Sequence, residues 1–291
     1  MGWWAEASQG RISLGPFRDE SNVGRGVDCV SRSVRDTAAL LDAVHGPGRR
    51  RDDRPRPDPP VPAGSAPTPA AAHRPAGPPP LRRAVHDDCA AAARHAAGLL
   101  ASLGHTVEEG YPDALRNQEF ARRFGAMWST NMGVSFARIE AQLGRSLTPA
   151  DVEPVNWVQA EFARQVSGVD YALGLAANVE FRRAVQQWWA DGWDLLLTPT
   201  LGEPPTPIGT FANNPEHPMA PMARAAGYVP FTPAFNSSGQ PAINLPLYWN
   251  ADGLPIGVQL VAAYGREDVL LRVAAQLEAA QPWADRRPSV G

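Results

Sequence analysis

Ala242-Ile-Asn-Leu-Pro-Leu247 and Ile256-Gly-Val-Gln-Leu-Val261 are two apolar runs separated by Asn250-Ala-Asp-Gly253. The Asp-Gly step permits the positive φ angles of a tight turn, so we expect the two runs to pair as strands. The chain then continues with acidic residues near position 267 and apolar residues at helical spacing, which predicts a closing helix over residues 266–277.

The segments before this hairpin alternate helical and strand patterns. Ser33, followed three places later by Asp36, is a capping-box-like start for an amphipathic helix. Asp194-Leu-Leu-Leu197 is too short for a helix and stops at Thr198-Pro199-Thr200, so it predicts a buried strand. The full set of expected elements is helices at 33–45 and 87–103, a short strand at 105–109, consecutive helices over 113–190, and the strand at 194–197. This order predicts an α/β fold with a mixed sheet flanked by helices.

The composition changes sharply between residues 47 and 80, where 12 of the 30 prolines lie. Leu, Ile and Phe are almost missing there, so we expect no core from this stretch. Arg is frequent, but no aromatic residues alternate with it to stack on bases, and a solvated linker is therefore favoured over a nucleic-acid patch. The predicted organisation is a first segment at 1–47, a disordered Pro/Arg-rich linker at 48–83, a main region at 84–285 and a tail at 286–291.

Charge and cysteine content exclude several classes of protein. The 291 residues carry 27 basic and 30 acidic side chains, and every basic one is Arg, because the sequence contains no Lys. Neither a nucleic-acid nor a membrane partner is expected from this balance. Cys29 and Cys89 lack partners at metal-ligand spacing, and no His pair is placed to help them. We predict a soluble, cytoplasmic protein without a metal or cofactor.

Three segments, in this order, resemble the amidase signature family of hydrolases, which cleave carbon–nitrogen amide bonds. They are Gly10-Arg-Ile-Ser-Leu-Gly-Pro16 with Ser31-Arg-Ser-Val-Arg-Asp-Thr-Ala-Ala-Leu-Leu-Asp42, then Asp194-Leu-Leu-Leu-Thr-Pro-Thr200, then Phe231-Thr-Pro-Ala-Phe-Asn-Ser-Ser-Gly-Gln-Pro-Ala-Ile-Asn-Leu-Pro246 with Gly265-Arg-Glu-Asp-Val-Leu-Leu271. The third segment and the closing Pro282-Trp-Ala-Asp285 look most similar to members that act on simple or cyclic oligoamides. The resemblance implies a small carboxamide as substrate.

The family's mechanism uses a Ser nucleophile, a second Ser held in a cis peptide and a buried Lys that accepts a proton. The Gly/Ser-rich loop of that machinery has no counterpart here, and Arg cannot replace the Lys because its guanidinium stays protonated at neutral pH. The resemblance therefore implies a C-terminal part of an amidase, a truncated form without its catalytic residues. The alternative is a non-catalytic ligand-binding or subunit protein that completes a partner chain.

Such a part can still supply the wall of a substrate pocket. The candidates are Met127, Trp128, Asn131, Thr198, Thr200 and Gln240. A second triad from Ser237 or Ser238 with His217 and Asp252 is not favoured, because no Gly-x-Ser-x-Gly elbow is present and the family places this segment as a turn into a strand. A fold without its N-terminal strands leaves a sheet edge and apolar helix faces uncovered, so we expect marginal stability unless a partner chain or homo-oligomer covers them.

Overall fold

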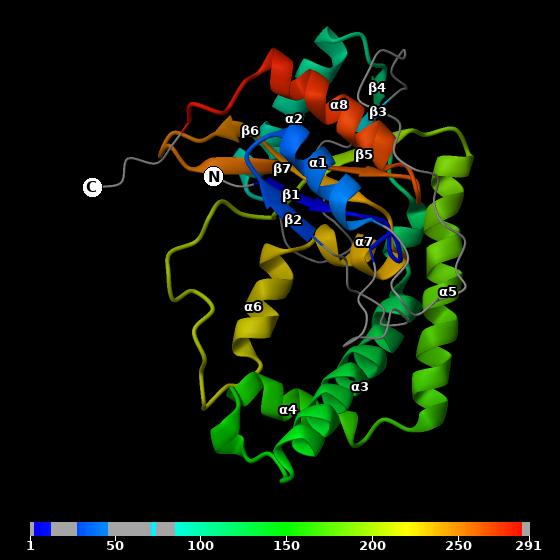
Figure 1. Ribbon diagram of the computed structural model, residues 1–291, viewed down its shortest axis with the longest axis vertical. Coiled ribbons are helices and arrows are strands. Elements are labelled where there is room, and N and C mark those ends of the chain that lie inside the picture. The colour runs from blue at the N-terminus through cyan, green and yellow to red at the C-terminus, as the bar shows by residue number, and fades with distance from the viewer. Residues whose placement is uncertain (1–2, 13–27, 46–70, 74–84, 287–291) are drawn as a thin grey trace.

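A computed structural model describes residues 3–12, 28–45, 71–73 and 85–286 of the chain (Figure 1). Within these residues one mixed sheet of seven strands has the order β2-β1-β6-β7-β5-β3-β4. The strands are β1 (Trp3–Glu6), β2 (Asp28–Ser31), β3 (Ala71–His73), β4 (Val107–Glu108), β5 (Leu195–Pro199), β6 (Ala242–Trp249) and β7 (Pro255–Ala262). Helices flank this sheet, so the predicted α/β class is confirmed.

The centre of the sheet is the hairpin predicted from the Asp-Gly step. β6 and β7 are antiparallel, with Ile243 opposite Leu260. In the turn, the Asn250 side chain accepts hydrogen bonds from the backbone N–H groups of Asp252 and Leu254, and Gly253 adopts a φ of 74°. Both strands are longer than the apolar runs that predicted them, because pairing continues through Tyr248 and Trp249 toward the turn.

Three helices cover one face of the sheet: α1 (Val34–Val44), α2 (Asp87–Ser102) and α8 (Glu267–Ala280). Ser33 caps α1 as expected, because its hydroxyl accepts a hydrogen bond from the Asp36 N–H. Alternate residues of β5, β6 and β7 point into this layer and join the three helices in one core, which includes Leu197, Leu245 and Leu260. We call this side the closed face.

The other face carries α3 (Gln118–Leu143), α5 (Gly168–Ala190) and α7 (Thr232–Ser238), and α3 continues into an arm completed by α4 (Pro154–Ala163). Helix α6 (Ala220–Tyr228) lies beside this arm, and short 3-10 helices occupy η1 (Asp113–Arg116) and η2 (Pro149–Asp151). The predicted helical tract at 113–190 is thus divided into η1, α3, η2, α4 and α5. We call this side the open face.

The resemblance implied a turn into a strand at residues 236–239, but residues 236–238 are the last residues of helix α7 (Thr232–Ser238). Pro233 lies in its first turn, where a missing N–H has no consequence, and Gly239 ends it with a φ of 81°. The Ser237 hydroxyl donates to the Pro233 carbonyl oxygen at 3.0 Å, which binds that side chain to its own helix.

Trp188 stacks on Trp193 with ring centroids 5.1 Å apart and meets Trp189 edge-on, so these three rings pack within the fold. Of the Pro/Arg-rich stretch 48–83, Ala71–His73 form β3, which pairs in parallel with β4 and β5. The rest of that stretch, and the tail beyond residue 286, lie outside the described residues, and the predicted linker stays a prediction.

Candidate functional site

A row of polar side chains crosses the centre of the sheet on the open face. Thr198 of β5 lies opposite Gln259 of β7, and Gln259 lies opposite Asn244 of β6. The neighbours of these residues along each strand, such as Ile243 and Leu260, face the closed core, so the three polar side chains point the other way. Gln259 Nε2 donates to Thr198 Oγ1 at 3.4 Å.

Thr200 joins this row from the loop that follows β5. Its hydroxyl donates to Asn244 Oδ1 at 2.5 Å, and its backbone N–H donates to the carbonyl oxygen of Gly257. A Cβ atom on Gly257 would stand 2.1 Å from Asn244 Oδ1, so only glycine leaves space for the asparagine side chain. We call Thr198, Thr200, Asn244 and Gln259 the polar row.

The polar row is uncharged and suits recognition rather than bond cleavage. Thr198, Thr200 and Gln259 are buried, whereas Asn244 is half-buried and is the member nearest to solvent. Amides and hydroxyls can donate to and accept from a neutral amide, but none of them can act as a base near neutral pH. In the described part of the chain no group of His, Cys, Asp and Glu side chains could hold a metal ion.

Gln240 lies in a separate buried cluster at the start of β6. Its side-chain oxygen accepts from the Ser238 hydroxyl, and its Nε2 donates to Gln186 Oε1 of α5 at 3.1 Å. Gln186 Oε1 also accepts from the backbone N–H of Tyr264 at 3.3 Å. These bonds connect α7 and α5 to the residues that follow β7, so the Gln240 cluster stabilises the packing of these elements.

The three candidates on α3 take different positions. Met127 is buried with Leu196 and Val261, in the core beneath the open face. Trp128 is 42% exposed and donates from Nε1 to Gln159 Oε1 of α4 at 2.8 Å. Asn131 is half-buried one turn further along α3. The structure thus brings Thr198 and Thr200 together, whereas Trp128 has its partner in the arm; the pocket-lining role of all six candidates stays a prediction.

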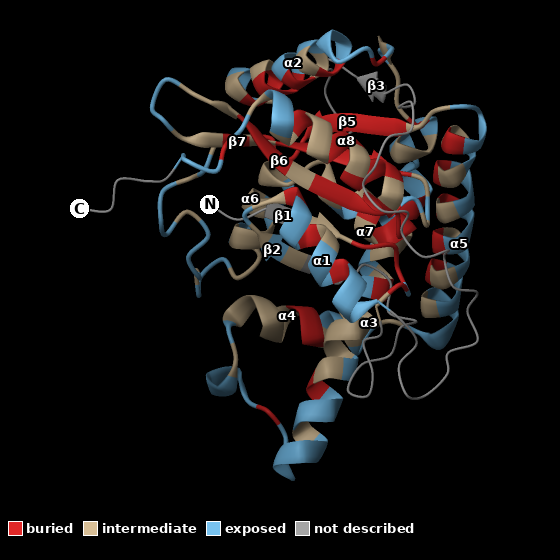
Figure 2. Cartoon of the chain, turned by 45° about the horizontal axis from the view of Figure 1, so that its top comes forward, coloured by how far each residue is buried: buried red, intermediate tan, exposed pale blue. Residues whose placement is uncertain are grey.

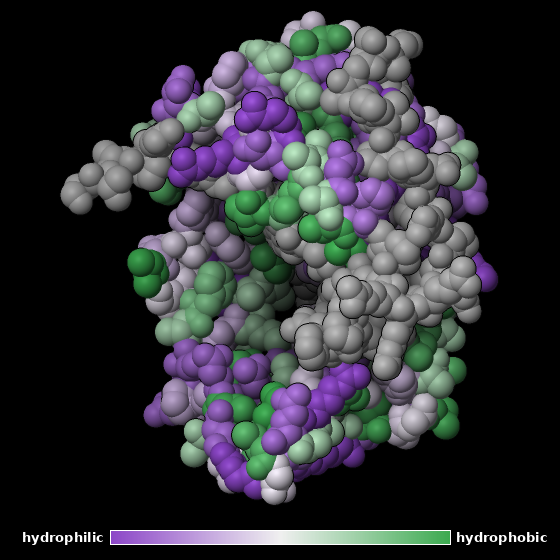
Figure 3. All heavy atoms as spheres, in the orientation of Figure 1, coloured by the Kyte–Doolittle hydropathy of each residue, from purple (hydrophilic) through white to green (hydrophobic). Residues whose placement is uncertain are grey.

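The space-filling view shows a hollow between the sheet and the α3–α4 arm (Figure 3). The arm is linked back to the body through Gln159, because its Nε2 lies 3.8 Å from the Met222 sulfur of α6. Gln159 therefore contacts both Trp128 and Met222 from a buried position. One buried amide holds three helices around the hollow.

The serines of α7 do not meet the proposed triad partners. Ser237 donates to the Pro233 carbonyl and Ser238 to Gln240, while His217 and Asp252 are exposed on separate loops. Cys89 is the buried thiol of α2, and burial, with the nearby charges of Asp88 and Glu203, raises its pKa to about 12. A thiol with this pKa is not ionised at neutral pH and is not a nucleophile.

Comparison with known proteins identifies the family. The family model described as "Amidase" matches residues 7–271. The chain belongs to the amidase family. It is 40% identical over 300 residues to 6-aminohexanoate-cyclic-dimer hydrolase of Paenarthrobacter ureafaciens, and equally so to that of Pseudomonas sp. (strain NK87). Each match covers 97% of this chain and 60% of the relative, so the chain spans about three fifths of their length.

The fold agrees with that of a solved amidase. The structure of 6-aminohexanoate cyclic dimer hydrolase complexed with substrate matches with a TM-score of 0.88 and 37% identity, over 99% of this chain and 62% of that one. The resemblance to the amidase signature family is therefore confirmed. None of the helices in the described residues of this amidase-family chain has the length and apolar character needed to span a membrane.

Asn244 and Gln259 are the two residues of the polar row that sequence reasoning missed. Each is a lone polar residue inside an apolar strand run, and the hairpin turn fixes which residues lie opposite one another. Counting residue pairs outward from the turn at Asp252-Gly253 would have shown that the side chains of Asn244 and Gln259 lie on the same face.

Proposed function

We propose that this chain forms the substrate-binding part of an amide hydrolase whose nucleophile and base lie outside these 291 residues. The observation that carries the proposal is the half-buried Asn244 in the polar row. Its Oδ1 is occupied by the Thr200 hydroxyl, while its Nδ2 makes no hydrogen bond within the described residues. A half-buried amide N–H that has no partner in the described part of the protein can donate to the carbonyl oxygen of a carboxamide.

The other members of the row would hold Asn244 in this orientation. Thr200 fixes Oδ1, and Gly257 leaves the space in which the side chain lies. A donor held in place before the substrate arrives loses little side-chain freedom on binding. The row would orient the amide, and bond cleavage would require the Ser, cis-Ser and Lys that the family resemblance implies and that this sequence cannot supply without Lys.

The names of the relatives suggest the class of substrate. Two curated relatives at 40% identity are hydrolases of the cyclic dimer of 6-aminohexanoate. We therefore propose small cyclic or linear aliphatic amides as substrates. The two cysteines are free, which fits a reducing compartment, and we place this chemistry in the cytoplasm.

A complementation assay tests the proposal. The purified chain alone should release no amine from 6-aminohexanoate cyclic dimer, whereas mixing or fusing it with the N-terminal part of the Paenarthrobacter relative should restore release. In the restored enzyme, Asn244→Ala should lower kcat/KM by about tenfold, because one substrate hydrogen bond is lost. The control Asn213→Ala changes an exposed loop residue and should leave the rate unchanged. Turnover by the chain alone, or full activity of Asn244→Ala, would contradict the proposal.

The second candidate function is a non-catalytic ligand-binding or subunit protein. Exposed apolar side chains on α3, including Val134 and Leu143, favour contact with another polypeptide or with a second copy of the chain. Under this function the chain should bind the cyclic dimer and gain thermal stability, yet the complemented assay should stay without turnover. Co-purification of the chain with a Lys-containing N-terminal amidase half would favour the subunit form of this second function.

A further inference from the structure

A groove on the arm is lined by charged side chains of both signs. It lies between α3, the end of α4 and the start of α5, and its volume is about 630 Å³. This volume is in the range of pockets that bind small molecules. The described residues that line the groove include neither a member of the polar row nor any of the six candidates predicted from the sequence. The groove is therefore a separate site.

Two guanidinium groups share one carboxylate in this groove. Glu119 accepts from Arg123 Nε at 2.6 Å through Oε1 and from Arg122 Nη2 through Oε2. The other N–H groups of the two arginine side chains make no hydrogen bond within the described residues. A guanidinium has five N–H donors, so both side chains can bind Glu119 and a second carboxylate at the same time.

A second acidic side chain lines the groove from α5. Asp170 lies in the first turn of that helix, and its Oδ2 accepts from the Ser167 hydroxyl at 2.6 Å. Its Oδ1 has no hydrogen-bond partner within the described residues. This oxygen can accept from a ligand that brings an N–H group, while Oδ2 continues to cap the helix.

The packing of α3 against α5 separates the two charged ends of the groove. Phe120 stacks on Phe181, and Gly174 packs so closely on Met127 that a Cβ atom there would stand 2.7 Å from Met127 Cγ. The two helices are therefore antiparallel, and Asp170, one turn before Gly174, lies beside the part of α3 that follows Met127. The two arginines belong to the part before it. At 1.5 Å per residue, the ends are roughly 10 Å apart along α3.

We propose that this groove binds a zwitterionic ω-amino acid with an aliphatic chain. Its carboxylate would accept from Arg122 and Arg123, its ammonium group would donate to Asp170, and its methylene groups would lie against Phe162 and Val166. The lining residues carry two positive and two negative charges, so a ligand with both charges is more complementary than a simple cation or anion. Ring opening of a cyclic amide by water leaves such a molecule, but binding in the groove is measured without turnover and does not depend on that function.

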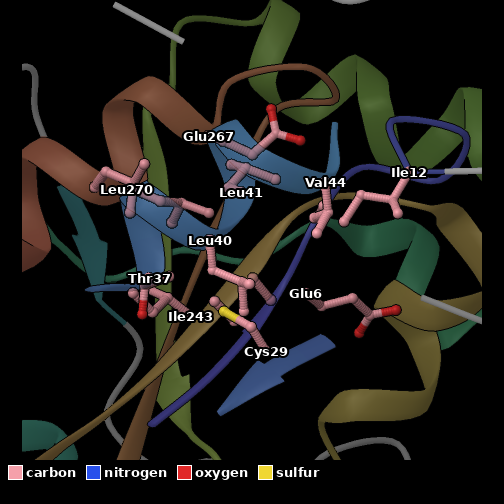
Figure 4. A pocket seen from close by; sticks show the side chains of 14 residues that line it. Glu6, Ile12, Cys29, Thr37, Leu40, Leu41, Val44, Ile243, Glu267 and Leu270 are labelled. Carbon is pink, nitrogen blue, oxygen red and sulfur yellow. The ribbon is translucent and has the colours of Figure 1, made fainter. Parts of the chain in front are cut away.

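The pocket on the closed face differs in its chemistry from this groove. It lies between β1, β6, α1 and α8 and has a volume of about 180 Å³ (Figure 4). Its walls are mostly apolar, with Leu40 and Val44 from α1 and Leu270 from α8. None of the described residues that line it is basic, so it offers a carboxylate no cationic partner and serves as a control.

NMR titration of the ¹⁵N-labelled chain with 6-aminohexanoate, at pH 7 and constant ionic strength, tests the site. Hexanoate and n-hexylammonium each carry one of the two charges and serve as matched probes. The zwitterion should bind at least about fivefold more tightly than either probe, because each probe loses one hydrogen bond between charged groups. The shifts should concentrate on residues 119–129 and 162–170. No binding, an affinity equal to that of either probe, or shifts confined to other parts of the chain would overturn the proposal.

Substitutions at each end of the groove identify the partner of each charge. Combining Arg122→Gln with Arg123→Gln should lower the affinity for the zwitterion to that for n-hexylammonium, and Asp170→Asn should lower it to that for hexanoate. Arg183→Gln removes an exposed guanidinium of α5 outside the groove, and Leu40→Trp fills the closed-face pocket; both should leave the affinity unchanged. If Asp170→Asn fails to fold, the arginine double variant still decides, because it leaves the cap of α5 in place: undiminished binding of the zwitterion by that variant would overturn the proposal.

Discussion

The closed and open faces of the sheet differ in how completely their helices are buried (Figure 2). On the closed face, seven of the 14 residues of α8 are buried. On the open face, three of the 26 residues of α3 are buried, and Leu143 near its end is 52% exposed. Helix α8 is therefore part of a closed core, whereas α3 is an arm that is only partly covered.

This difference separates the face that supplies most of the packing from the face that we propose binds the substrate. The closed face joins residues from the first and last parts of the sequence, since Arg11 and Ser8 both bond to Glu267. The open face holds the polar row and the hollow beside the arm. Packing on one side can therefore hold the strands that position Asn244 while the other side remains accessible to a substrate or a partner.

Removing Arg11 should cause the largest loss of stability. Arg11 and Glu267 form a buried ion pair, and Arg11→Ala leaves the Glu267 carboxylate buried with less compensation, which costs about 3–5 kcal/mol. Urea unfolding measures the free energy, and Arg35→Ala, which removes an exposed pair with Asp36, serves as the control with no resolvable change. Equal effects of the two substitutions would show that the closed face is not the stable half.

Truncating one leucine on each face compares the faces directly. Leu277 of α8 is fully buried in the closed core, so Leu277→Ala should cost about 2–5 kcal/mol through lost contacts and a cavity. Leu143→Ala on α3 removes the same atoms from an exposed position and should change the free energy of unfolding by less than about 0.5 kcal/mol. A similar loss from Leu143→Ala would mean that α3 is covered by packing in solution.

The closed face was largely predictable from the sequence, because its elements carry local signals. Ser33 with Asp36 located the start of α1, and Asp252-Gly253 located the hairpin. Apolar residues at helical spacing located α8. Each of these signals acts within a few residues of the structure that it specifies.

The open face was less predictable, because its geometry depends on residues far apart in sequence. Gln159 contacts Trp128 and Met222 across 31 and 63 positions, and no periodicity encodes that choice of partners. Helix α7 has only seven residues, with Pro233 at its start, and so lacks a helical pattern long enough to recognise. Asn244 was overlooked because a single polar residue in an apolar run looks like an exception until the register is known.

Gly257→Ala tests whether the polar row needs its present spacing. The added methyl group would collide with Asn244 Oδ1, and displacing that side chain should cost about 1–3 kcal/mol and break the bond to Thr200. Combining it with Asn244→Ala removes the collision, so the double variant should be more stable than the sum of the single changes predicts. Additive free energies would show that the open face relaxes easily around this position.

Cys89 makes the stability of the closed face sensitive to alkaline pH. Its pKa is raised to about 12, first by burial and then by Asp88 and Glu203, whereas the unfolded thiol titrates near 9. The folded state therefore retains its proton where the unfolded state loses it. Stability from this group is complete below pH 9 and falls between pH 9 and 12, by about 1.4 kcal/mol per pH unit. Cys89→Ala should remove that contribution to the slope, as measured by urea unfolding across this range.

Alkylation by iodoacetamide at pH 8 gives the gentlest comparison of the two faces, since it leaves the fold intact. Thiolates react and thiols do not, so native Cys89 should remain unmodified while the exposed Leu143→Cys variant is labelled at the rate of a free thiol. Peptide mass spectrometry separates the two positions from Cys29. Labelling of Cys89 would then report opening of the closed face. If the labelling rate of Cys89 rises at urea concentrations well below the unfolding midpoint, this face opens locally rather than as one cooperative unit.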